Sequence, residues 1–147
     1  MHAAARMPAL DEYNARVIAC QEDAFTLACY ALGDESQAAQ VVQAAVRQAY
    51  WCFDGSEGRC REQILSAIAE GCRRSTARGL GEPTQGVFTA LPVEERLAVI
   101  LVDVLAMNYR QAAEILRHPA AQFARLLAQG RCKAMNQPTS DTNGLQI

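Results

Sequence analysis

The chain has 147 residues, half of them apolar and a fifth charged, and its formal net charge is −2. This composition excludes a disordered chain and fits one compact domain or two small ones. No apolar run approaches the roughly 20 residues of a transmembrane helix, and the N-terminal residues lack the apolar centre of a signal peptide. We therefore expect a cytoplasmic protein without a membrane span.

The residues that usually carry metal or catalytic chemistry are scattered. The histidines are His2 and His118, and no two cysteines have C-x-x-C spacing. The sequence therefore predicts neither a metal site nor a cofactor, and in an intracellular protein it predicts reduced, partly buried thiols. Because no Ser/His/Asp set is present and paired carboxylates are adjacent in sequence, we expect no enzyme. The six cysteines are Cys20, Cys29, Cys52, Cys60, Cys72 and Cys132.

Charge is unevenly distributed along the chain. Residues 1–58 carry three Arg against eight acidic residues, whereas residues 59–82 carry five Arg against three acidic residues. Residues 109–147 carry five basic residues against two acidic ones. Two modestly basic segments thus lie in an acidic chain, and a strong nucleic-acid binder usually carries more positive charge.

The first half reads as three helices. Apolar residues recur at helical spacing over 10–32, and Gly33 follows as a natural stop. Asp34, three residues before Gln37, has the spacing of a capping box and predicts the start of a second helix. Its expected inner face carries Ala39, Val42, Val46, Ala49, Tyr50 and Phe53.

A third helix is expected from about residue 59 to residue 74. Residues 75–90 are rich in Gly, Thr and Ser and contain Pro83, so they predict a linker. The first domain therefore spans residues 1–74. The inward residues expected on the third helix are Ile64, Leu65, Ile68 and Cys72.

The second half reads as a helix followed by a helix-turn-helix. Pro92, with acidic residues in the first turn after it, predicts a helix to about Leu105. Asn108 should cap a short helix that ends at Leu116, residues 117–119 form a turn, and residues 120–135 form the last helix. We therefore expect an all-α chain with a second domain at 91–136 and a tail at 137–147.

This order of parts resembles the extracytoplasmic-function class of bacterial sigma factors, over residues 11–135. The segment LPVEERLAVILVDVLAMNYRQAAEILRHP follows the family pattern without a gap. The resemblance implies two small helical domains, a sigma region 2-like three-helix bundle and a sigma region 4-like helix-turn-helix. The matching residues are Leu91, Pro92, Arg96, Leu101, Asp103, Val104, Tyr109, Ala113, Glu114, Ile115, Leu116 and Pro119.

In the first domain, LGDESQAAQVVQAAVRQAYWCF resembles the conserved family region that docks on the β′ clamp helices of RNA polymerase core. The resemblance implies polymerase contacts at Gln40, Gln43 and Arg47, and an ordinary polar helix face is the alternative. Two acidic residues of the family pattern are replaced here, by Gln40 and Ala44.

The third helix departs from the family at positions that capture melted promoter bases. Ile64 stands where the family has Trp, and Gly71 where it has Asn. An aromatic side chain stacks on a base with about 1–3 kcal/mol, which Ile64 cannot supply. The remaining candidates for phosphate contacts here are Arg73, Arg74 and Arg78.

The expected recognition helix also departs from the family. In AQFARLLAQGR, three basic family residues are replaced by Ala124, Leu126 and Gln129. Leu126 is read either as a scattered apolar residue, as a partner surface, or as a contact with the first domain if the domains pack. The candidate DNA contacts, with a solvated helix face as the alternative, are Arg110, Gln111, Gln122, Arg125, Arg131 and Lys133.

Two functional hypotheses follow from the resemblance. In the first, the chain is a sigma-like factor that binds RNA polymerase core and promoter DNA, with an anti-sigma factor as a further partner. In the second, it is a divergent relative that has lost promoter recognition and acts as a protein-interaction module for polymerase, an anti-sigma factor or its own copy. A helical ligand-binding enzyme is a distant third. The sequence leaves open the oligomeric state and whether the domains pack together.

Overall fold

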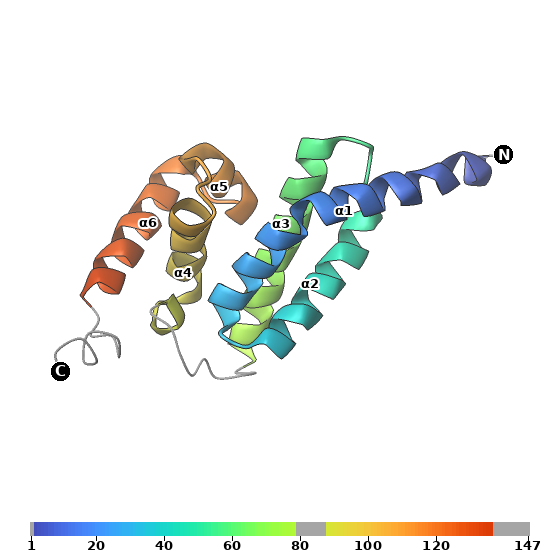
Figure 1. The fold of residues 1–147 in the computed structure, drawn as a ribbon. Coiled ribbons are helices and arrows are strands. Elements are labelled where there is room, and N and C mark those ends of the chain that lie inside the picture. Colours follow the sequence, from blue (N-terminus) through green and yellow to red (C-terminus); the bar gives the residue numbers. More distant parts are fainter. Residues whose placement is uncertain (1, 79–87, 137–147) are drawn as a thin grey trace.

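The computed structural model describes residues 2–78 and 88–136, and every regular element in this part of the chain is helical. The all-α prediction is confirmed. Most of the predicted linker and the predicted tail lie outside the described residues. The first unit consists of α1 (His2–Leu32), α2 (Glu35–Tyr50) and α3 (Glu57–Ala77) (Figure 1). The second consists of a 3-10 turn η1 (Phe88–Ala90), α4 (Val93–Val99), a π-helical turn η2 (Ile100–Val104), α5 (Tyr109–Leu116) and α6 (Ala120–Met135).

The predicted boundary between α1 and α2 is confirmed. Gly33 adopts φ 70°, a left-handed conformation that glycine accepts readily, and its amide donates to Cys29 O at 2.8 Å. Asp34 then caps α2 by accepting from Ser36 N at 2.9 Å. The core face of α2 differs from the prediction: of the six expected residues, only Val42 and Ala49 are buried, and Phe53 lies beyond the end of the helix. The buried residues of this helix are Ala38, Val42, Ala45 and Ala49.

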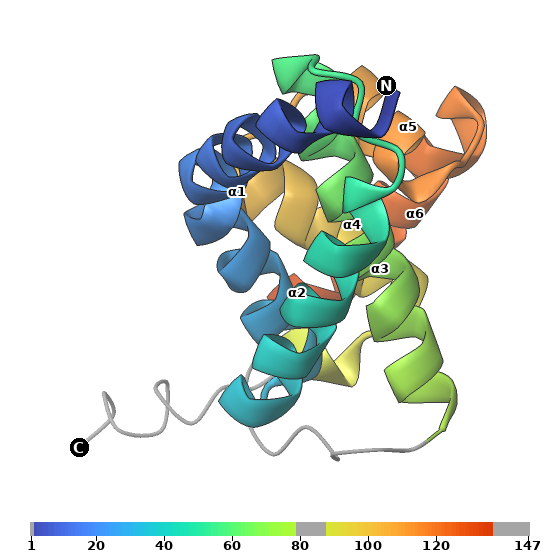
Figure 2. The same cartoon turned by 90° about the vertical axis from the view of Figure 1, so that its right-hand side faces the viewer.

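The helix α3 runs through the middle of the molecule, in contact with α1 and α2 on one side and with α4 and α5 on the other (Figures 1 and 2). It continues to Ala77, three residues beyond the expected end. Gly71 lies where α3 approaches α2 closely, since a Cβ added there would meet Val41 Cγ1 at 2.8 Å. The four predicted inward residues, Ile64, Leu65, Ile68 and Cys72, are all fully buried.

The first helix of the second unit has the expected extent, but its last turn is π-helical. Leu105 N donates to Ile100 O at 3.0 Å, five residues back. Behind this segment, α6 packs against α4 with Phe123 and Leu127 buried. Gly130 permits the closest approach, because a Cβ there would lie 2.7 Å from Val99 Cγ2.

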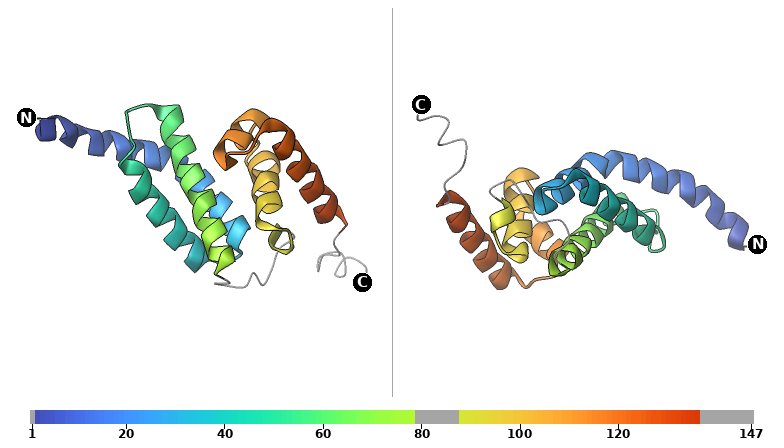
Figure 3. Two further views of the ribbon diagram at one scale, coloured as in Figure 1. Left: turned by 180° about the vertical axis from the view of Figure 1, so that it is seen from behind. Right: turned by 90° about the horizontal axis from the view of Figure 1, so that it is seen from below.

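The two units pack against each other. The sequence alone left open whether they do so. In addition to the contacts of α3, α1 contacts η1, α4 and η2 (Figure 3). The buried apolar residues of both units therefore form one continuous core. The helix α6 packs mainly on α4 and α5, beyond α4 as seen from α1 (Figure 1). Packing of the two units consequently does not explain the half-buried Leu126. No helix in the described ranges has the length and apolar character of a membrane span.

Candidate functional site

The helices α5 and α6 form a tight helix-turn-helix. Asn108 Oδ1 accepts from Gln111 N at 2.8 Å, which confirms the predicted N-cap of α5. Arg117 ends α5 in the left-handed conformation with φ 60°, and His118 N donates to Ala113 O at 3.0 Å. Pro119 then precedes α6. Local backbone and capping contacts thus define a short turn between α5 and α6.

The outer face of α6 carries little charge. Its inner face is anchored by the buried Phe123 and Leu127, and the polar residues Gln122, Arg125 and Gln129 are exposed on the outside. Three alanines, at positions 121, 124 and 128, are exposed beside them. Arg125 is therefore the one charged side chain in the first three turns of this helix.

Two further predicted DNA contacts on α6 are engaged within the second unit. Arg131 donates to both Asp103 oxygens, at 2.6 and 3.0 Å, and to Tyr109 Oη at 3.0 Å. The hydrogen bonds to Asp103 and then to Tyr109 raise the pKa of Arg131. Lys133 Nζ lies 2.9 Å from the carboxylate of Glu95, which is 7% exposed. Binding a phosphate would compete with these contacts.

The remaining predicted DNA contacts lie at the surface of α3 and α5. Arg110 and Gln111 are exposed in the first turn of α5, and Arg74 and Arg78 are exposed at the end of α3. Arg74 and Arg117 line one groove of about 490 Å³ between α3 and α5. The structure thus brings basic residues of the two units to a shared groove, which also holds Glu62, Glu70 and Glu114.

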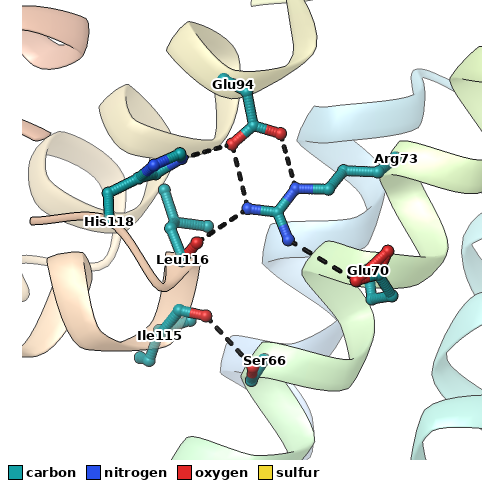
Figure 4. A network of polar contacts seen from close by, with 7 residues as sticks. All are labelled: Ser66, Glu70, Arg73, Glu94, Ile115, Leu116 and His118. Carbon is teal, nitrogen blue, oxygen red and sulfur yellow. Dashed lines mark hydrogen bonds and ion pairs between the residues drawn. The ribbon is translucent and has the colours of Figure 1, made fainter. Parts of the chain in front are cut away.

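Arg73, the last predicted DNA contact, lies between the units. Its Nε donates to Glu94 Oε2 at 2.5 Å, and its Nη2 donates to Glu94 Oε1 at 2.9 Å and to Leu116 O at 3.0 Å (Figure 4). His118 Nε2 lies 2.7 Å from the same Oε1 atom. A phosphate contact by Arg73 would require these bonds to open.

The side chains of α3 also satisfy the C-terminal end of α5. The carbonyl groups in the last turn of a helix lack partners within the helix. Leu116 O accepts from Arg73, and Ile115 O accepts from Ser66 Oγ at 3.1 Å (Figure 4). The C-terminal end of α5 is therefore held directly against α3.

The charges in this contact reinforce one another. Burial raises the pKa of the Glu94 carboxyl, but the hydrogen bonds from Arg73 and His118 outweigh burial and lower it overall. The hydrogen bond to Glu94 in turn raises the pKa of Arg73 despite its burial. A carboxylate that accepts from a guanidinium at two points makes a strong, directional contact.

A second connection between the units runs through Arg96, which is 5% exposed. Its guanidinium donates to Ala31 O in the last turn of α1 at 2.6 Å, and to Leu91 O at 2.7 Å. Burial lowers the pKa of Arg96. The sequence singled out Arg96 through the family pattern alone, and it assigned Glu94 only to a helix N-terminus and His118 only to a turn. The spacing along the chain carried no signal for the contacts between the units, in which Arg73 and Glu94 lie 21 positions apart and Ala31 and Arg96 lie 65 positions apart.

The predicted polymerase-binding residues share one exposed face of α2. Gln40, Gln43 and Arg47 are all exposed, and the core residues of α2 occupy the other side of the helix. Beyond the end of α2, Trp51 is 83% exposed, although tryptophan is highly buried on average in folded proteins.

The thiols are free, and three of them, Cys20, Cys60 and Cys72, are buried. Burial raises the pKa of Cys72 to about 12, so this thiol stays protonated at neutral pH. Within the ranges that the structure describes, no three His, Cys, Asp or Glu side chains gather as metal ligands.

Comparison with protein-family models gave no match, and comparison with curated proteins gave no significant match. The resemblance to sigma factors therefore depends on the residues quoted above.

Proposed function

We propose that this chain is a sigma-factor-like transcription initiation protein that binds RNA polymerase core and directs it to promoter DNA. The observation that supports the proposal best is the capped helix-turn-helix of α5 and α6. Its first helix, α5, and the turn up to Pro119 fall within the segment that follows the family pattern without a gap. The exposed polar face of α2, at which the resemblance implies polymerase contacts, also supports the proposal.

In this proposal only a small surface of the protein contacts DNA. Arg110, Gln111, Gln122 and Arg125 face solvent on the helix-turn-helix, whereas Arg131 and Lys133 are held by carboxylates. Few free cations mean few released counterions, so the affinity for DNA alone is modest. Simultaneous binding to polymerase compensates, because tethering raises the effective concentration of the helix-turn-helix at the promoter.

Reconstitution tests the proposal. The full chain is mixed with bacterial polymerase core, binding is followed by gel filtration, and the complex is used to select from randomised DNA at low salt. We expect co-elution and enrichment of a bipartite motif. The variant Q40A/Q43A/R47A should abolish co-elution without unfolding, because all three side chains are exposed. Co-elution that is unchanged in this variant would contradict docking through α2.

The neutral outer face of α6 favours a second candidate, a relative that has lost promoter recognition and binds proteins. Alanines occupy much of the surface where a DNA-reading helix presents polar and basic side chains. This candidate predicts co-elution with polymerase core or an anti-sigma factor that tolerates salt, together with no enriched DNA motif. Enrichment of a bipartite motif would exclude it.

A further inference from the structure

A large cleft opens where the two units meet, on the side of the molecule that holds the α1–α2 corner and the end of α6. Its volume is about 850 Å³, within the range of sites for drug-sized molecules. Elements from both units form its walls: the end of α1, the start of α2, η1, α4 with η2, and α6. We call it the corner cleft, and its apolar lining consists of Cys29, Tyr30, Phe88, Val99, Ala134 and Met135.

Two large side chains in the lining of the corner cleft are open to solvent. Tyr30 is 47% exposed and Met135 is 85% exposed, although both side chains are large and apolar. Tyr30 packs edge to face against Phe88, with ring centroids 5.6 Å apart, so the aromatic wall is ordered by its own contact. Aromatic rings with an adaptable methionine opposite are a typical lining for a small-molecule site.

The polar lining of the corner cleft is acidic. Asp34, Glu35 and Asp103 contribute three carboxylates, and Arg131 contributes the single cation. Arg131 is bound to both oxygens of Asp103, so it neutralises that carboxylate. Among the described residues, neither Asp34 nor Glu35 takes part in an ion pair. The net formal charge of the cleft lining is therefore negative, and the two carboxylates without an ion pair lie at the start of α2.

We propose that the corner cleft binds an organic cation of drug-like size, with an apolar body and a quaternary or protonated ammonium or phosphonium centre. The body would pack on Phe88, Val99 and Met135, and the cationic centre would lie near Asp34, Glu35 and the face of Tyr30. Because both units line the cleft, such a ligand would also bridge them and stabilise their packed arrangement. This inference does not depend on the proposed role in transcription.

Calorimetric titration of the full chain with a charge-matched pair of probes tests the proposal. Tetraphenylphosphonium and tetraphenylborate have nearly the same size and shape and opposite charge. We expect one phosphonium ion to bind per chain, and the borate to bind at least about tenfold more weakly. Equal affinity for the two ions would overturn the assignment of a cation site, and so would a lack of phosphonium binding.

Two double variants test which carboxylates attract the phosphonium ion. D34N/E35Q removes the two carboxylates at the cleft and keeps a good N-cap at position 34, because Asn caps helices as well as Asp does. D11N/E12Q makes the same chemical change at exposed positions of α1 that do not line the cleft. We expect D34N/E35Q to weaken phosphonium binding about fivefold to tenfold and D11N/E12Q to leave it unchanged. Equal losses in both would mean that overall charge, and not the corner cleft, attracts the cation.

A filling substitution provides an independent test of the cavity. A134W places a large side chain at a half-buried position of the lining and should abolish phosphonium binding while the helical circular dichroism persists. Full binding by folded A134W would overturn the proposal. If this variant does not fold, the comparison of the two double variants decides.

Discussion

Arg73 and Glu94 join the two helical units through a two-point contact, with Nε to Oε2 at 2.5 Å and Nη2 to Oε1 at 2.9 Å. A guanidinium that meets a carboxylate in this way fixes direction as well as distance. Because His118 and Leu116 belong to the same network, the contact also sets the position of the helix-turn-helix relative to α3. Specific side-chain contacts therefore fix the arrangement of the two units.

Neutralising this contact should destabilise the chain. In E94Q, a neutral amide replaces the carboxylate that Arg73 and His118 share, so the three hydrogen bonds to this group lose their charged acceptor in a partly buried place. We expect the free energy of unfolding to fall by about 2 kcal/mol in urea titrations. R59Q is the control, because it breaks the exposed pair with Asp54 and should cost less than about 1 kcal/mol. Similar losses in both variants would contradict a structural role for Glu94.

The lowered pKa of Glu94 predicts that its contribution to stability is lost at acidic pH. Although burial raises the pKa of Glu94, its two partners lower it overall, below the ordinary value of 4.5. A carboxyl whose folded pKa is lowered stabilises the fold above its unfolded pKa, and this stabilisation is lost as the pH falls through the folded value. The difference in unfolding free energy between wild type and E94Q should therefore shrink below pH 4.5. Urea titrations at a series of acidic pH values measure it, and a constant difference would be the contrary result.

Elements that depend on neighbours in sequence were predictable, and contacts between distant elements were not. Asn108, Gly33 and Asp34 act within four residues of themselves, so their residue types predicted the helix ends correctly. The partner of Arg73 lies 21 positions away and depends on how α3 packs against α4. The same holds for the corner cleft, whose residues come from both halves of the chain.

Glycine substitutions test the close approach of α6 to α4. Alanine normally stabilises a helix by about 1 kcal/mol relative to glycine. At Gly130, however, the new Cβ would lie 2.7 Å from Val99 Cγ2 and 3.0 Å from Glu95 O. We expect G130A to lower the free energy of unfolding by about 1–3 kcal/mol, and G58A, which meets nothing within 4 Å, to raise it slightly. Thermal unfolding distinguishes the two, and stabilisation by both would mean that the helices separate easily.

Removing the buried guanidinium of Arg96 should loosen α1 from α4. R96M keeps much of the side-chain volume but leaves Ala31 O and Leu91 O without their donor. Since unsatisfied buried carbonyls cost about 1–3 kcal/mol each, we expect a loss of about 2–4 kcal/mol. Hydrogen exchange should become faster in the last turn of α1. A loss of stability without faster exchange in the last turn of α1 would mean that Arg96 stabilises the second unit and not its contact with α1.

If the chain binds DNA as proposed, the salt dependence of that binding should distinguish exposed cations from those paired with carboxylates. Arg125 is exposed on α6, whereas Lys133 lies 2.9 Å from the buried carboxylate of Glu95. Each phosphate contact contributes about 0.9 to the slope of log affinity against log salt, because binding releases counterions. R125A should therefore reduce the slope by about 1, and K133A should change it much less. Fluorescence anisotropy with the polymerase complex and selected DNA, between about 50 and about 200 mM salt, measures both slopes. An equal reduction in the two variants would mean that Lys133 leaves Glu95 on binding, and no reduction in R125A would remove α6 from the DNA surface.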